Sequence, residues 1–292
     1  MFQIYAQVIV YGIYLGALYG LAAVGLALIF GVMEILQIAH GSIVMLGGYF
    51  AFWLFSVYRV DPIVSLPIVM IVFFLLGIGL FKILFSSLVD LSPDDRVKNS
   101  MLVAFGLILV TDNLTTLACT GNVRTINPFY SGLSCQVGCV QIPYIGMITV
   151  TLGGAMIIAL HLFLRKTIAG KVIRAPAHSA VFARLVGINI SRTYSVAMGI
   201  ETALGAAGGV LVCTSTGVDP TIGMDWTLKA LLITVLAGTG NVGGVFLCGL
   251  FFGIIEAIGS IIIGPYKEII GLVLFLVVLL WRPQGVFSKQ PA

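Results

Sequence analysis

Long apolar runs constrain this chain more than any other feature of its sequence. The first run, Ile4–Phe30, contains no charged side chain. Several later runs also exceed the roughly 20 residues that a helix needs to cross a bilayer. The chain is 60% hydrophobic and only 9% charged, whereas roughly a quarter of the residues in an average soluble domain are charged. Because the alternating strands of a transmembrane β-barrel are missing, the sequence predicts an all-α polytopic membrane protein.

The apolar runs divide the chain into a series of predicted helices. One of them, Trp226–Ala237, has 12 residues, or about 18 Å of helix, and is too short to cross alone. We expect about 8–9 transmembrane segments, including two Gly-interrupted hairpins, in a single membrane domain over residues 1–292. The segments are Ile4–Phe30, 31–55, Ile63–Phe85, Met101–Ala118, Tyr144–Phe163, Tyr194–Thr216, Trp226–Ala237, a run ending at Ile263, and Ile269–Trp281.

A basic stretch interrupts the apolar sequence over residues 165–192 and contains no acidic side chain. Its basic residues are Arg165, Lys166, Lys171, Arg174, Arg184 and Arg192. By the positive-inside rule such a loop, about residues 164–193, lies in the cytoplasm. We expect a short helix over Ala177–Leu185, because Pro176 is tolerated at a helix start and Gly187 can end a helix. A short helix on a cytoplasmic loop indicates a surface for a partner protein.

The other basic residues give the predicted orientation. With the N-terminus outside, eleven Lys and Arg residues fall on the cytoplasmic side and four on or near the outer side. This bias favours a periplasmic N-terminus and a cytoplasmic C-terminus. No cleavable signal peptide is predicted, because no Lys or Arg precedes Arg59. The net charge of +4 lies mostly on one face, which fits contact with membrane lipid and does not favour nucleic-acid binding.

Two polar interruptions break the apolar sequence, one in each half of the chain. In the first, Glu34, Gln37 and His40 are spaced three residues apart, so they would share one face of a helix. Ionisable side chains at this depth usually face a watery cavity, and broken helices line such cavities. The alternative is that His40 caps a helix end near the membrane interface. The second interruption is the glycine-rich stretch Gly238–Gly244. The candidate solute path combines residues of both interruptions, namely Glu34, Gln37, His40, Gly41, Gly240, Asn241 and Gly244.

Several enzyme motifs are missing from the sequence. It has no GxxxxGK[ST] phosphate loop, so we do not expect this chain to hydrolyse ATP, and it has no HExxH or GxSxG motif. The five cysteines form no metal-binding pattern, and we predict no metal or cofactor. Cys135 and Cys139 fall in an outer loop where a disulfide or two free thiols would fit equally well. An enzymatic function would require a fold that brings together polar residues far apart in the sequence, namely Glu34, His40, Glu201 and Glu256.

Four stretches resemble, in order, one family of membrane proteins: GLALIFGV, ILQIAHGSIVMLGGY, AGKVIRAPAHSAVFARLVGI, and LKALLITVLAGTGNVGGVFLCGL with the terminal WRPQG. The chain is similar to permease subunits of ABC importers of the branched-chain (hydrophobic) amino acid uptake family. The resemblance implies a bacterial inner membrane, a second permease subunit, two cytoplasmic ATP-binding cassette subunits and a periplasmic solute-binding protein. It also implies that the 174–188 helix couples to the ATPases through Arg174, Ala175, Ala177, Ala183, Arg184, Gly187 and Ile188.

The chain departs from the family pattern in two places. It has His178-Ser179-Ala180 where relatives usually carry acidic or amide residues, and Gln37-Ile38 where they have Asn-Phe or Asn-Met. The second departure leaves the solute open, because the family carries urea and short amides as well as leucine-like amino acids. A stand-alone channel or secondary transporter is the other class of hypothesis, but it would need no docking helix. We expect Ala183 and Gly187 to give that helix a small-residue docking face.

Overall fold

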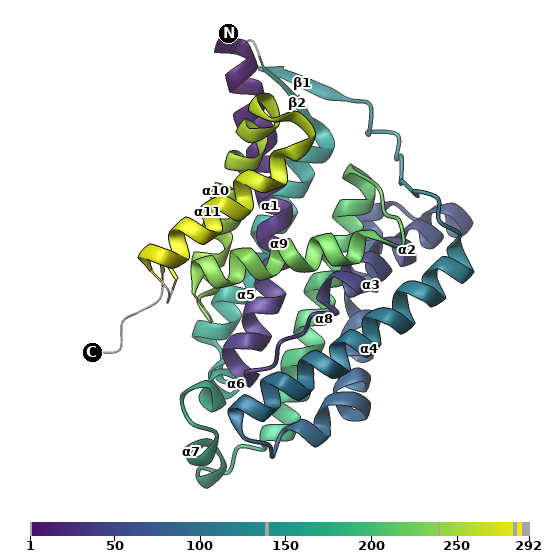
Figure 1. Ribbon diagram of the computed structural model, residues 1–292. Coiled ribbons are helices and arrows are strands. Elements are labelled where there is room, and N and C mark those ends of the chain that lie inside the picture. The colour runs from purple at the N-terminus through teal and green to yellow at the C-terminus, as the bar shows by residue number, and fades with distance from the viewer. Residues whose placement is uncertain (1, 138–139, 239, 283–284, 288–292) are drawn as a thin grey trace.

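The computed structural model describes residues 2–137, 140–238, 240–282 and 285–287, most of them in helices (Figure 1). The helices are α1 (Phe2–Met33), α2 (His40–Tyr58), α3 (Pro62–Leu80), α4 (Pro93–Cys119), α5 (Tyr144–Lys166), α6 (Ile168–His178), α7 (Ala180–Leu185), α8 (Ile190–Ser215), α9 (Ile222–Ala237), α10 (Val242–Ile262) and α11 (Lys267–Trp281). Seven of the described helices are long and apolar enough to cross a membrane, and α9 and α11 are shorter. The predicted all-α polytopic membrane fold is confirmed.

The helix ends follow local signals that apolar runs do not reveal. The segment predicted from Met101 belongs to α4, which begins earlier because Ser92 caps it and accepts a hydrogen bond from the Asp95 N–H at 3.3 Å. The segment predicted to end at Phe85 is α3 followed by a π-helical turn over Phe81–Phe85 and a 3₁₀ turn over Ser86–Leu88. Polar first turns and tightened last turns thus extend or reshape helices beyond their apolar cores.

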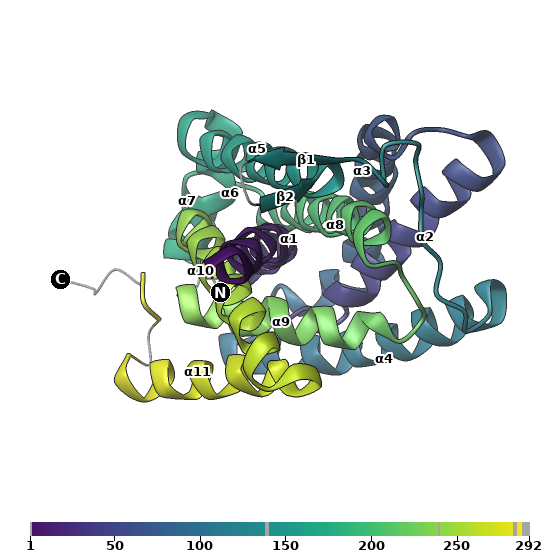
Figure 2. The ribbon, with the colours of Figure 1, turned by 90° about the horizontal axis from the view of Figure 1, so that it is seen from above.

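Helices α1 and α8 form the centre of the molecule. The most apolar 18-residue window of each is 89% buried, whereas the corresponding window of α4 is only 11% buried. Figure 2 looks close to the axis of α1 and shows the other helices arranged around it. The outer helices therefore present most of their apolar surface to lipid or to another protein, as expected for a membrane subunit.

Small residues let the central helices approach closely. Gly16 on α1 lies against α10, where an added Cβ would be 2.6 Å from the Leu250 Cα, and a Cβ on Gly253 would lie 2.3 Å from the Gly16 nitrogen. Gly209 on α8 meets α2 in the same way, 1.9 Å from the Val44 carbonyl oxygen. Gly12, four residues before Gly16, likewise lies against the backbone of α10, where an added Cβ would be 2.6 Å from the Ile254 Cα. These glycines serve helix packing, because a larger residue would collide with the neighbouring backbone.

The first polar interruption is a true break between helices. α1 ends at Met33 and α2 begins at His40, and Glu34 has a left-handed backbone with φ 54°. The prediction that Glu34, Gln37 and His40 share one helical face is therefore wrong, because no helix runs through residues 34–39. The predicted interruption is present, but residues 34–39 include no glycine, and Gly41 lies in the first turn of α2.

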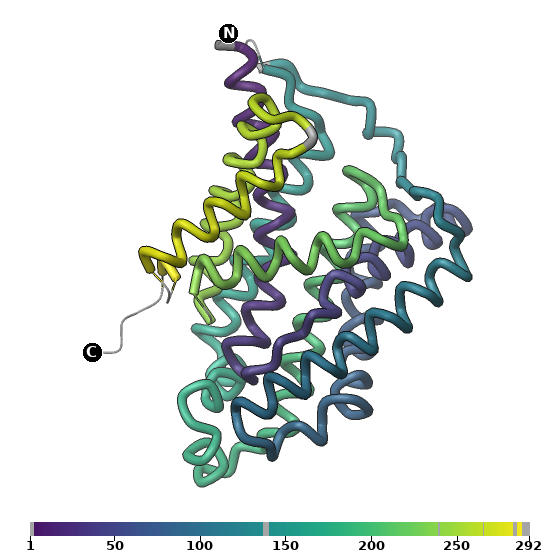
Figure 3. Tube along the Cα trace, in the orientation of Figure 1, coloured from purple at the N-terminus to yellow at the C-terminus, as the bar shows by residue number. Residues whose placement is uncertain are grey.

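The second interruption separates α9 from α10. α9 contains 16 residues and begins at Ile222, ahead of the predicted Trp226. Figures 1 and 2 show that α9 runs across α1 instead of alongside it, while α10 follows α1. The Cα trace in Figure 3 shows the chain turning sharply at the end of α9. Because α9 runs across α1, the two ends of α9 lie in different parts of the molecule.

The basic loop forms two helices. α6 ends at His178 and contains Pro176, and α7 begins at Ala180, so the single helix predicted over Ala177–Leu185 is wrong at its start. Ser179 sets the boundary, because its hydroxyl oxygen accepts a hydrogen bond from the Phe182 N–H at 3.3 Å. Gly187 ends the segment with φ 84°, as expected for a residue after a helix.

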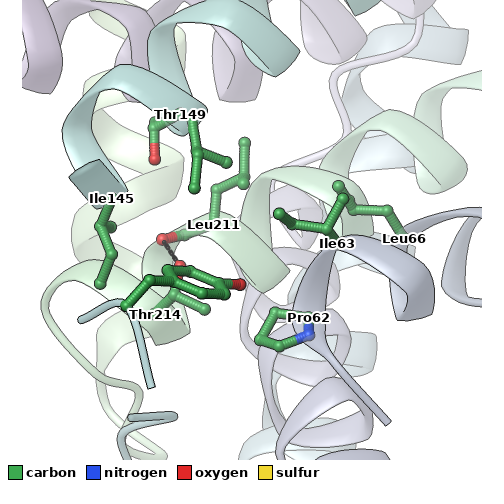
Figure 4. A pocket seen from close by; sticks show the side chains of 9 residues that line it. Pro62, Ile63, Leu66, Ile145, Thr149, Leu211 and Thr214 are labelled. Atoms are coloured by element: carbon green, nitrogen blue, oxygen red, sulfur yellow. Dashed lines mark hydrogen bonds between the residues drawn. The ribbon is translucent and has the colours of Figure 1, made fainter. Parts of the chain in front are cut away.

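The opposite end carries the longest loop, which contains the antiparallel pair β1 (Ser134–Val137) and β2 (Val140–Pro143). The Tyr130 hydroxyl donates to the Asp61 carboxylate at 3.1 Å, and burial together with this hydrogen bond raises the pKa of Tyr130. Tyr130 also lines a cleft of about 10 Å³ between the nearby ends of α3, α5 and α8. Figure 4 shows other side chains that line it, among them Ile63, Ile145 and Thr214. The cleft has room for about one water molecule. Cys139 lies outside the described residues, so the disulfide prediction has no structural outcome.

Candidate functional site

His40 lies in a sealed position at the start of α2. Its side chain and that of Glu201 on α8 are both 0% exposed. The Nδ1 atom of His40 hydrogen-bonds to Glu201 Oε1, and Nε2 lies 2.7 Å from the carbonyl oxygen of Ala22 on α1. Because a carbonyl oxygen only accepts hydrogen bonds, Nε2 carries the hydrogen and donates a hydrogen bond to the Ala22 carbonyl oxygen. One side chain therefore joins three helices through two buried polar contacts.

Two glycines close the space around the His40 ring. A Cβ added to Gly205 would lie 3.0 Å from the ring carbon Cε1, and one added to Gly25 would lie 3.2 Å from the same atom. Any side chain at either position would press on the imidazole. The ring is 0% exposed and is thus enclosed by the backbone at these two glycines. This geometry favours the interpretation of His40 as a structural contact at a helix end.

The neighbouring path candidates differ in their surroundings. The Glu34 side chain is 58% exposed, and its Oε2 lies 4.0 Å from Arg96 Nη1. Gln37 is 0% exposed, and neither its amide nitrogen nor its amide oxygen has a hydrogen-bond partner among the residues that the structure describes. Gly41 is a crossing point of α2 and α9, because its N–H donates to the Thr227 hydroxyl at 2.9 Å.

The second set of path candidates lies beyond the far end of α9. Asn241 caps α10 by accepting a hydrogen bond from the Gly244 N–H at 3.2 Å, and its Nδ2 donates to the Phe287 carbonyl at 3.1 Å. Gly240 has φ 82° and approaches Gly31 at the end of α1. Gly41 contacts the beginning of α9, whose 16 residues span about 24 Å. Gly240 therefore meets the end of α1, just before the first interruption, whereas Gly41 lies at the other end of α9.

The candidate coupling residues all lie at the end of the molecule that carries α6 and α7 (Figure 1). Arg174 and Ala177 are exposed on α6, and Ala175 is partly buried. The exposed Arg184 pairs with Asp90 at 2.7 Å, which ties α7 to the turn before α4. Ile188 closes the segment, because its N–H donates to the Ala183 carbonyl at 3.0 Å.

The exposed face of α7 is apolar, and it is not the face expected from the sequence. Ala183 is only 4% exposed, so the expected docking face of Ala183 and Gly187 is corrected: Ala183 packs inward. Phe182 is 71% exposed and Leu185 is 76% exposed. Val181 and Val186 are also exposed on this segment. An apolar cluster on a basic extramembrane loop indicates a protein-binding surface. The sequence prediction chose the wrong face because it did not show which side chains of this six-residue helix are buried.

A charged cluster joins α9, α10 and α11, and sequence reasoning did not assemble it. Lys229 on α9 has its Nζ 3.7 Å from Glu256 Oε1 and 3.2 Å from Glu268 Oε1, and Lys267 Nζ lies 3.3 Å from Glu256 Oε1. The Lys229 ammonium also donates to the Tyr19 hydroxyl at 3.3 Å. Glu256 is 1% exposed. Ionisable groups at such positions pair with each other and mark solute or ion pathways.

Comparisons with known proteins agree with this architecture. Residues 8–280 match the family described as "Branched-chain amino acid transport system / permease component". The high-affinity branched-chain amino acid transport system permease protein BraD of Pseudomonas aeruginosa is 28% identical, with 98% of this chain and 96% of BraD covered. The corresponding permease protein LivH of Escherichia coli is 26% identical, with 99% and 97% covered.

A solved structure of PsaBC from Streptococcus pneumoniae in complex with Fab shares the fold. It matches with a TM-score of 0.51 and 12% identity, and the match covers 94% of this chain and 91% of the other. At this identity the likeness concerns the fold alone. The family match covers nearly the whole chain and includes every transmembrane helix described above. The chain therefore belongs to the permease component family of branched-chain amino acid transport systems.

Proposed function

We propose that this chain is a membrane permease subunit of an ATP-driven importer for branched-chain amino acids. It acts as a single membrane domain in the bacterial inner membrane, with its N-terminus in the periplasm and its C-terminus in the cytoplasm. A second permease subunit completes the path, two ATP-binding cassette subunits supply ATP hydrolysis, and a periplasmic protein delivers the solute. The names of BraD and LivH support the solute class.

The exposed apolar segment of α7 is the observation that carries the coupling part of this proposal. Phe182 and Leu185 project from a loop rich in basic residues, outside the apolar helices. Exposing such side chains to water is unfavourable, by about 1.5–3 kcal/mol for a side chain that burial would fully cover. A cleft on an ATPase subunit would remove that cost. The Arg184–Asp90 pair and the partly buried Ile188 would hold the segment in place while it docks.

A matched pair of substitutions tests the docking surface. Phe182→Arg places a charge in the α7 segment, and Phe129→Arg makes the same change at an 89% exposed phenylalanine in the loop at the other end of the molecule. We expect both variants to insert normally, and only Phe182→Arg to lose co-purification of the ATPase subunits. Equal co-purification of ATPase with both variants would contradict the docking role.

The solute class is tested with the complete importer in lipid vesicles. ATP hydrolysis is measured with the binding protein and leucine, isoleucine, valine, urea or acetamide in turn. We expect stimulation by the three amino acids. Stimulation by urea or acetamide alone would replace the amino-acid assignment with the amide alternative. Solute flux that needs no ATPase subunit would instead favour a stand-alone channel or secondary transporter.

A further inference from the structure

The charged cluster of α9, α10 and α11 borders a cavity of about 60 Å³. Because one water needs about 10–15 Å³ measured in this way, the cavity has room for several waters or for a small polar group. Its polar lining consists of Asp225, Lys229, Glu256 and Glu268, and Leu232 and Phe252 contribute apolar walls. In Figure 2 α11 lies beside α9. The side chains that line the cavity come from α9, α10 and α11.

The buried carboxylate that borders this cavity lacks hydrogen-bond partners. Glu256 is 1% exposed, and neither of its carboxylate oxygens accepts a hydrogen bond from the described residues. The two lysines lie 3.3 and 3.7 Å from Oε1, which is longer than the 2.7–2.9 Å typical of charge-assisted hydrogen bonds. A buried carboxylate with loose ion pairs and a free acceptor is costly unless another donor reaches it.

The charges around the cavity complement both ends of an amino acid. Two ammonium groups, of Lys229 and Lys267, face three carboxylates, of Asp225, Glu256 and Glu268. The formal charge of this set is −1, so one carboxylate has no lysine of its own and is available to an incoming cation. The Lys229 ammonium and the Tyr19 hydroxyl lie 3.3 Å apart and form an adjacent pair of donors for an anion.

We propose that this cluster receives the zwitterionic head group of the amino acid during its passage. The solute's ammonium donates to Glu256 Oε2 and Asp225, and its carboxylate accepts from Lys229 and Tyr19. Leu232 and Phe252 lie against its hydrocarbon side chain. This inference rests on the proposed function, because a neutral amide has neither charge to offer. The cluster would thus select amino acids inside the permease itself, in addition to the selection made by the solute-binding protein.

The test uses the complete importer in vesicles and a leucine analogue that carries a diazirine in its side chain. Illumination during ATP turnover attaches the analogue to nearby residues, which are identified by mass spectrometry. We expect labels on α9, α10 or α11 beside the cavity, among them Leu232 or Phe252. Neutralising one charge contact costs about tenfold to a hundredfold in binding, so Glu256→Gln should lower both labelling and uptake per folded complex by at least about tenfold.

The control variant is Lys98→Met, which removes an exposed lysine near the beginning of α4 and should leave labelling and uptake unchanged. Leucine uptake with labels only elsewhere would overturn this inference and leave the proposed function standing. An absence of leucine uptake by the wild-type importer would overturn the proposed function and this inference with it. If Glu256→Gln lowers melting temperature and yield while the folded complex still labels normally, the cluster is structural and the inference fails.

Discussion

Two groups of ionisable side chains lie among the membrane helices of this permease, and they differ in access. His40 and Glu201 are each 0% exposed and are enclosed by Gly25 and Gly205. Lys229 is 19% exposed and borders a cavity together with the buried Glu256. The sealed pair can meet only its protein partners, whereas the open cluster can meet a solute. Under our proposal, the transport path therefore contains the buried charge that borders a cavity and not the buried charge that is sealed.

Hydrogen bonding alone does not separate the two groups. Both ring nitrogens of His40 have partners, in Glu201 and in the Ala22 carbonyl. Glu201 Oε2, however, is buried without a hydrogen-bond partner among the described residues, as are both carboxylate oxygens of Glu256. Losing either partner of the sealed pair would leave a further buried polar group unpaired. The two groups differ in access, because Glu256 borders a cavity whereas His40 and Glu201 are 0% exposed.

The largest expected effect comes from breaking the sealed pair. Glu201→Leu leaves His40 Nδ1 buried without a partner, and removing one member of a buried pair costs about 3–5 kcal/mol. We expect a large loss of folded protein, measured by size-exclusion chromatography and melting temperature in detergent. Glu34→Leu, at a side chain that is 58% exposed, is the matched control and should fold normally. Normal yield of Glu201→Leu would show that the pair does not hold the helices.

Substitution of His40 sharpens the distinction between structure and transport. His40→Gln can still hydrogen-bond, so we expect it to fold with a loss of about 1–2 kcal/mol and to keep most uptake, whereas His40→Leu should fold poorly. If both variants fold but neither transports, His40 belongs to the solute path after all.

The smallest effect is expected at the rim of the open cluster. The Glu268 side chain is 57% exposed and lies 3.2 Å from Lys229. Exposed ion pairs contribute only about 0–1 kcal/mol and are screened by salt. Glu268→Gln should therefore leave melting temperature unchanged and lower uptake by less than about threefold, measured in low and high salt. A loss as large as that of Glu256→Gln would place the solute at the rim instead of at the buried carboxylate.

The helices were predictable, because an apolar run long enough to cross a membrane admits few other structures. Ile4–Phe30 became α1, and the basic loop became the extramembrane segment of α6 and α7. The shared face of Glu34, Gln37 and His40 was not predictable, since it assumed that a helix continues through residues 34–39. Helical spacing has meaning only where the helix exists.

The missed features of the site depend on contacts between distant parts of the chain. Lys229, Glu256 and Glu268 come from three helices, and spacing in the sequence does not bring them together. The inward packing of Ala183 depends on how α7 lies against the rest of the molecule. The apolar residues at positions 181, 182, 185 and 186 could have been noticed, because they are unusual in a loop rich in basic residues.

The most direct test of the account measures stability and uptake on the same samples. The double variant Lys229→Met with Glu256→Gln removes both charges of the open pair, so it leaves no single charge buried alone. In the complete importer we predict a melting temperature within about 5 °C of wild type and leucine uptake per folded complex at least about tenfold lower. Unchanged uptake, or uptake that falls only as far as the amount of folded complex falls, would contradict a solute-binding role for the open cluster.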